Sequence, residues 1–79
     1  MKWRGTQILI RGRWVRPGMR FAHRRWTVAQ TDGTSRPDTC TVVAVRQGVV
    51  HYRSESGQDS GGSPSEFVNH VDGWLPEVA

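Results

Sequence analysis

Cysteine is almost absent from this 79-residue sequence, which contains Cys40 alone. A single thiol excludes an intramolecular disulfide. The other potential metal ligands are three scattered histidines, His23, His51 and His70, with no paired spacing typical of a metal site. A metal site would have to be assembled by tertiary contacts alone. We therefore expect no metal or other cofactor, and a reducing, cytoplasmic compartment.

Long apolar runs are also missing. The longest run near the N-terminus, Ile8 to Ile10, is far shorter than the core of a signal peptide or a membrane-spanning helix. We expect a soluble, unexported protein without a membrane partner. Apolar residues at helical spacing extend over no more than about one turn, and the chain contains no repeat or heptad, which argues against a helical bundle.

Acidic residues are missing from the first part of the chain. Positions 1 to 31 contain eight basic residues and no acid, positions 32 to 46 contain two of each, and positions 47 to 79 contain five acids and one base. The three segments carry +8, 0 and −4, which sum to the net charge of +4. Lys2 is the single lysine, and the ten arginines favour planar contacts with phosphate, carboxylate or aromatic rings.

Short β-favouring runs separated by turn residues make up most of the chain. The clearest signal is a hairpin, because Gln47-Gly48 joins two β-rich runs and places glycine where a tight turn needs positive φ. The predicted strands are Thr6–Ile10, Arg13–Val15, Arg25–Gln30, Thr39–Arg46, Val49–Ser54 and a short Trp74-Leu75 closed by Pro76.

Two segments have the composition of loops. Thr31–Asp38 is rich in turn residues, and ten of the eleven residues of Glu55–Ser65 are Ser, Gly, Pro, Asp or Glu. We expect the second segment, residues 55–65, to be a mobile loop. Ser65 is a candidate N-cap for one helical turn over Glu66–His70, which Asp72-Gly73 would end.

These elements predict a mainly β fold, a small five-stranded, SH3-like, partly open barrel with one helical turn before the last strand. Residues 1–12 form an N-terminal extension or first strand. Residues 13–79 form a single domain, since so short a chain supports one small core.

Several short motifs resemble small proteins of temperate bacteriophages. They are a "hydrophobic-x-Pro-Gly" entry at Val15–Gly18, a "Val…Val…Gly-x-Val-x-Tyr" hairpin from Val42 to Tyr52, and a "Pro…Phe" turn at Pro64 and Phe67. The resemblance covers about Arg13 to Leu75. It implies an SH3-like barrel of phage or prophage origin in the cytosol of a bacterial host, and it implies no particular activity.

The stretch GQDSGGSP, Gly57 to Pro64, contains the DSGG letters that surround the nucleophile of chymotrypsin-like proteases. Catalysis there needs a histidine beside the serine, a carboxylate behind the histidine and an oxyanion hole. His51 could approach Ser60 only if the segment folded back, and a flexible loop is a poor support for a preorganised site. We therefore expect no enzyme activity and no small-molecule substrate.

Arginine and tryptophan alternate in the basic N-terminal part, a pattern suited to phosphate neutralisation and base stacking. Because neighbours in a strand point to opposite faces, Trp14 and Trp26 could equally face the core. We favour the core for these two rings and expect Trp3 to be exposed. The predicted nucleic-acid-binding residues are Arg11, Arg13, Arg20, Arg24, Arg25 and Trp3.

The leading hypothesis is a non-enzymatic binding module that contacts nucleic acid through this basic face. The alternative is a phage-encoded factor that binds and inhibits or redirects a host protein. The acidic C-terminal third could also neutralise the face internally or pair with a second copy of the chain.

Overall fold

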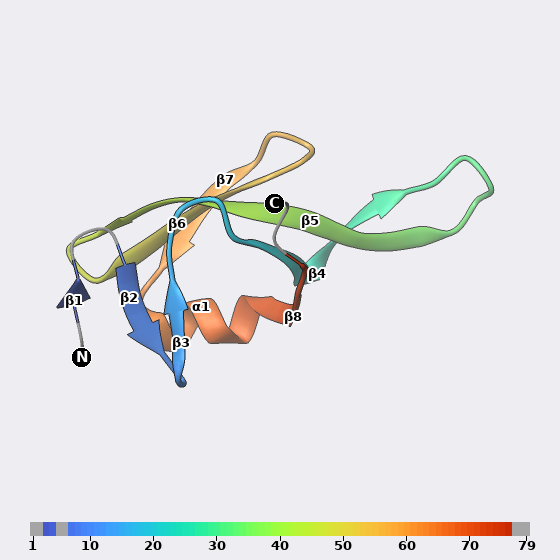
Figure 1. Cartoon of the computed structure of the whole chain (residues 1–79). Helices are drawn as coiled ribbons and strands as arrows, with labels where there is room; N and C mark the ends of the chain where they lie inside the picture. The colour runs from blue at the N-terminus through green and yellow to red at the C-terminus, as the bar shows by residue number, and fades with distance from the viewer. Residues whose placement is uncertain (1–2, 5–6, 77–79) are drawn as a thin grey trace.

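The computed structural model describes residues 3–4 and 7–76, and within this range the chain forms strands and one helix (Figure 1). The elements in chain order are β1 (Trp3–Arg4), β2 (Gln7–Ile10), β3 (Arg13–Val15), β4 (Arg20–Ala29), β5 (Ser35–Arg46), β6 (Val49–Ser54), β7 (Asp59–Gly62), α1 (Pro64–His70) and β8 (Val71–Trp74).

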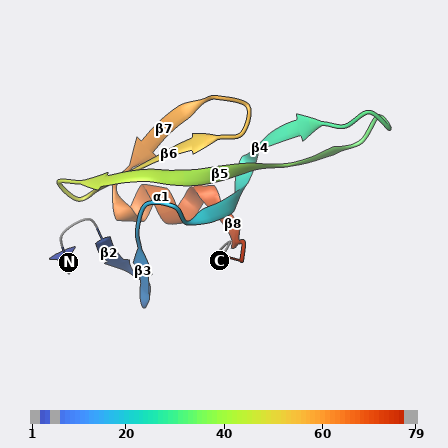
Figure 2. The same ribbon diagram turned by 45° about the horizontal axis from the view of Figure 1, so that its top comes forward.

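The strands form two antiparallel sheets. The first has the order β1-β2-β3, and the second has the order β7-β6-β5-β4-β8. Helix α1 lies beneath the larger sheet, and the small sheet stands beside the helix (Figures 1 and 2). The fold is mainly β with one short helix, as predicted, but the sheets do not close into a barrel.

The core lies between the larger sheet, α1 and the small sheet. Alternate residues of β5 supply Cys40 and Val42 to it, while Thr39 and Thr41 point to the opposite face. The buried apolar residues are Ile8, Ile10, Val15, Met19, Phe21, Cys40, Val42, Val45, Val50, Tyr52 and Phe67. Trp26 packs against this core, as predicted.

The two tight hairpins have the same backbone geometry. Gln47 and Gly48 have φ of 51° and 77°, so the predicted β5–β6 hairpin is confirmed with a type I′ turn. Arg11 and Gly12, between β2 and β3, have φ of 48° and 78° and form a second turn of this kind. This turn carries an arginine to the outer end of the small sheet.

The predicted loop at residues 55–65 is wrong in its second half. Asp59–Gly62 forms β7, an edge strand paired with β6 from Val50↔Gly62 to Arg53↔Asp59. Composition was misleading because these glycines serve close packing. A Cβ on Gly61 would lie 3.0 Å from the Val50 carbonyl oxygen, and one on Gly62 would lie 3.0 Å from the Glu66 Cβ.

The helix before the last strand is confirmed and ends at His70 as predicted, but its predicted start is wrong. Ser63 is the N-cap instead of Ser65, and Pro64 opens the helix, where proline's missing N–H costs nothing. The Ser63 Oγ accepts from the Glu66 backbone N–H and donates to the Glu66 carboxylate, so the N-cap contacts both the backbone and the side chain of the third helical residue. Asp72-Gly73 lies in β8 because it pairs with β4.

The segment 31–38 is a loop only at its start. Strands β4 and β5 continue on either side of residues 30–34 and form a long hairpin that extends beyond the rest of the molecule (Figures 1 and 2). The Asp32 carboxylate closes the tip by accepting from the Thr34 N–H at 3.0 Å and hydroxyl at 2.6 Å. Among the described residues, no helix has the length and apolar character needed to cross a membrane.

Candidate nucleic-acid interface

A groove opens where the β2–β3 hairpin faces the C-terminal end of α1 and strand β8. Its volume is about 320 Å³. Two arginines of the β2–β3 hairpin and a third from β4 line it together with apolar side chains and one tryptophan. The lining residues are Ile10, Arg11, Arg13, Val15, Arg24, Phe67, Val68, Val71 and Trp74.

Arg13 reaches the groove because of its position in β3. Val15, two residues later on the same face, is buried in the core, and Arg13 pairs with Ile10 of β2 near the end of the sheet. Its guanidinium carbon lies 5.4 Å from the centroid of the Trp74 ring, which is a cation–π contact. Trp74 thereby holds a cation over its outer face.

Arg11 projects from the tight turn between β2 and β3 and is exposed. It also lines a second hollow, about 460 Å³, that continues along α1 toward Pro64 and Ser65. Within the described part of the chain, Arg11 forms no ion pair. Its charge is therefore available to a ligand on either side of the turn.

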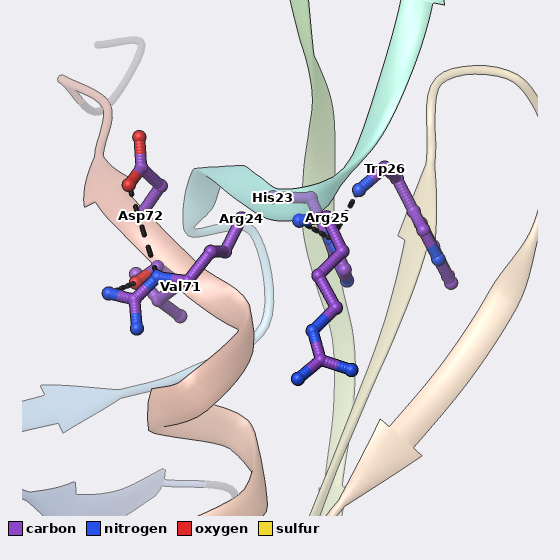
Figure 3. A network of polar contacts seen from close by, with 6 residues as sticks. All are labelled: His23, Arg24, Arg25, Trp26, Val71 and Asp72. Carbon is purple, nitrogen blue, oxygen red and sulfur yellow. Dashed lines mark hydrogen bonds and ion pairs between the residues drawn. The ribbon is translucent and has the colours of Figure 1, made fainter.

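Arg24 belongs to β4 but is directed toward the end of the helix (Figure 3). Its Nη2 donates to the Val71 carbonyl oxygen at 3.1 Å, and its Nε lies 4.0 Å from the Asp72 carboxylate. A cation at this place is favourable because the C-terminal end of a helix carries partial negative charge. Arg24 thus has a structural role, and half of its side chain remains exposed, with 53% accessible.

The structure brings only part of the predicted basic face together. Arg25 is exposed and points away from the Arg24 contacts (Figure 3), and Arg20 donates to the Pro76 carbonyl oxygen at 3.4 Å. Neither lines the groove. Trp3 lies in β1, and its side chain lies outside the described residues.

The predicted positions of the tryptophans are partly wrong. Trp14 is half-buried and does not pack against the core, because Val15 takes the inward position of the three-residue β3. Trp74, which the sequence suggested only as part of a last strand, is the aromatic residue of the groove. Its spacing from the arginines gives no signal, since it lies 61 positions after Arg13 and meets it through tertiary contact.

A buried polar network fixes the backbone of β4 beside the groove. His23 is 2% exposed, and its Nδ1 accepts from the backbone N–H groups of Arg25 at 3.0 Å and Trp26 at 2.9 Å. These contacts assign the ring proton to Nε2, which lies 3.3 Å from the Tyr52 hydroxyl. That hydroxyl lies 2.9 Å from Nδ1 of His70.

The network accompanies an irregularity in β4, whose pairing with β5 shifts between Ala22 and Thr27. The Trp26 ring stacks on His23 with centroids 4.2 Å apart. Burial lowers the pKa of His23, the nearby His70 and Arg25 lower it further, and Asp38 opposes them. A neutral His23 thus holds the segment from which Arg24 and Arg25 project.

The DSGG segment does not assemble a serine–histidine pair. Ser60 is the cross-strand partner of Tyr52, whereas His51 is the partner of Gly61. Because Tyr52 and His51 are neighbours in β6, their side chains point to opposite faces of the sheet. Ser60 and His51 therefore lie on opposite faces, and this geometry gives Ser60 no general base from His51.

No protein-family model matches the chain, and comparison with curated proteins and with solved structures gave no match.

Proposed function

We propose that this chain is a non-enzymatic module that binds nucleic acid through the arginine-lined groove. The observation that supports the proposal is the convergence of Arg11, Arg13 and Arg24 on one hollow whose lining contains no acidic side chain. Three guanidinium groups around an apolar floor attract a polyanion and offer bidentate contacts to its phosphates. Arg20 and Arg25 extend the positive charge beyond the groove.

Charge along the chain supports the same function. The acids of the C-terminal third are partly used within the fold, since Glu55 pairs with Arg36, Asp59 with Arg53 at 2.6 Å and Asp72 with Arg24. Among the described residues, Arg11, Arg13 and Arg25 have no acidic partner. The charge at the groove is therefore only partly neutralised from within.

The test is binding of labelled single- and double-stranded DNA at increasing salt. We expect affinity to fall steeply with salt, and Arg11→Ala to lower affinity across sequences and reduce the salt dependence by about one released counterion. Arg46→Ala is the matched control, because Arg46 is also exposed beside a tight turn but lies outside the groove. Absence of binding to both forms of DNA would overturn the proposal.

The SH3-like fold and the phage origin are part of the same proposal. The short helix directly before the last strand of the larger sheet supports an SH3-like, partly open arrangement. With the phage-like motifs, it supports a phage or prophage protein acting in the bacterial cytosol. The gene neighbourhood tests this origin, which adjacent phage genes would support and a cellular operon would contradict.

A host-protein partner is the second candidate function. Val43 of β5 is a large apolar residue exposed at 45%, and it lies on the face of the sheet opposite α1. A nuclease-treated pull-down from host lysate tests this candidate with Val43→Thr as the variant. A stoichiometric partner lost in Val43→Thr and kept in Arg11→Ala would favour protein binding over nucleic-acid binding.

A further inference from the structure

We propose that the groove accepts an unpaired base, so that the partner is single-stranded DNA. This inference rests on the proposed function and adds the class of nucleic acid to it. The lining combines two kinds of surface that a phosphate backbone alone would not need.

The first kind of surface is an apolar floor. Residues Ile10, Val68 and Val71 line the hollow between the arginines, together with the buried ring of Phe67. A duplex presents phosphates at its surface and keeps its base faces stacked inside. An unpaired nucleotide offers a flat apolar face next to its phosphate, and this combination matches an apolar floor with guanidinium groups at the rim.

The second kind of surface is a stacking platform formed by the Trp74 ring and the Arg13 guanidinium. The Trp74 ring is held edge-on by Phe21, with centroids 5.7 Å apart, and packs against Phe67 at 5.8 Å. The Arg13 guanidinium lies over the same ring at 5.4 Å, and the Arg13 side chain is exposed. A base can extend this stack on the outward face of the planar guanidinium, because arginine stacks with aromatic rings while keeping its charge.

The lining contains no side chain that requires a ribose. Its polar side chains are arginines and the indole of Trp74, which donate hydrogen bonds but accept none. They suit phosphate oxygens and base acceptors, and none can accept a hydrogen bond from a ribose 2′-hydroxyl. A site that distinguishes RNA uses that hydroxyl.

The second hollow extends the surface along which a DNA strand would lie. It shares Ile10, Arg11 and Val68 with the groove and continues beside Pro64 at the start of α1. The seven-residue helix is about 10 Å long. A DNA strand that passes both sides of Arg11 along this length therefore spans a short run of nucleotides. Arg11 then contacts a phosphate between neighbouring bases.

Four labelled ligands of equal length test the inference by fluorescence anisotropy: oligothymidine of about 12 nucleotides, an abasic DNA strand, a DNA duplex and oligouridine. We expect oligothymidine to bind about tenfold more tightly than the abasic strand, and more tightly than the duplex. Equal affinity for oligothymidine and the abasic strand overturns the base-stacking inference but leaves polyanion binding intact. Preference for the duplex or for oligouridine also overturns it, while loss of all binding overturns the proposed function itself.

Arg13→Lys separates stacking from charge in the same assay. Lysine keeps the positive charge but lacks the planar group over Trp74. We expect the preference for oligothymidine over the abasic strand to fall severalfold while abasic affinity stays unchanged, and Arg46→Lys to change neither. An unchanged preference in folded Arg13→Lys protein contradicts the role of the Trp74–Arg13 platform.

Discussion

At the scale of single residues, the glycines of the DSGG segment explain a motif that resembles a catalytic one. Gly61 lets the β6 backbone and His51 approach β7, and Gly62 lets α1 pack against the strand. The same letters that surround a nucleophile elsewhere thus serve packing at the edge of this sheet. For this reason, a function suggested by a sequence motif has to be checked against the geometry of its residues in the folded chain.

Gly62→Ala should destabilise the protein by about 1–3 kcal/mol, because the new methyl group would force Glu66 and the first turn of α1 away from β7. Urea unfolding followed by circular dichroism measures the loss. Gly73→Ala is the control, since nothing lies within 4 Å of a Cβ there and Gly73 needs no positive φ. Equal stability of the two variants would contradict the packing role.

His23 gives the fold a pH dependence of known sign. Its pKa in the folded protein is lowered, first by burial, so the unfolded chain takes up a proton at a higher pH than the folded protein does. Its stabilising contribution is present above the unfolded pKa of about 6.5 and is lost as pH falls from there toward the folded pKa. We expect the melting temperature to decrease over this window.

Thermal unfolding of wild type, His23→Gln and His51→Gln between pH 7.5 and pH 5 measures this effect. His51 is exposed and serves as the control, so its variant should keep the wild-type slope. If His23→Gln kept the wild-type decrease of melting temperature with falling pH, the pH dependence would belong to another group.

At the scale of elements, some secondary-structure elements follow from their local sequence, and others form only because they pair with a neighbouring element. The β5–β6 hairpin follows from its own turn residues, since Gly48 readily adopts the positive φ that the tight turn needs. Strand β7 has little β propensity and is ordered by pairing with β6. The helix begins two residues earlier than its composition suggested because Pro64 suits the first helical position and Ser63 caps it.

The two candidate caps can be compared directly. Ser63→Ala should cost about 1 kcal/mol, because it removes the oxygen that accepts from the Glu66 N–H. Ser65→Ala should be close to neutral, since Ser65 is exposed inside the first turn. The free energy of unfolding in urea measures both, and an equal or larger loss in Ser65→Ala would contradict the assigned cap.

At the scale of the whole molecule, the core protects the single thiol. Cys40 is fully buried in β5, and burial, with Asp38 and Glu55, raises the pKa of its thiol to about 12. The thiol is therefore neutral and inaccessible in the folded protein near pH 8. Its reactivity reports opening of the core shared by both sheets and α1.

Modification by a disulfide reagent at pH 8 should be slow in buffer and become fast in urea, in parallel with unfolding measured by circular dichroism. Gly62→Ala should accelerate it by the factor by which the variant increases the opened population. Rapid modification of the native protein would contradict the burial of Cys40, and reaction in urea well below the unfolding transition would indicate local opening of β5.

Much of the fold can be predicted from the sequence, and less of the candidate site. Alternating apolar residues and turn dipeptides predict β3, the β5–β6 hairpin and the helix before the last strand, because these signals act between near neighbours. They cannot predict how the two sheets face each other. Closure into a barrel depends on contacts between residues far apart in the chain, and the sheets remain open.

The sequence by itself determined the β character of the chain, its tight turns and its arginine-rich, acid-free first third. Only the tertiary structure decided which charges meet. It placed Arg24 at the end of α1, set Arg13 over Trp74 and left Arg25 outside the groove. The physical reason is that strand alternation and pairing register fix the direction of each side chain, and both depend on partners that lie elsewhere in the sequence.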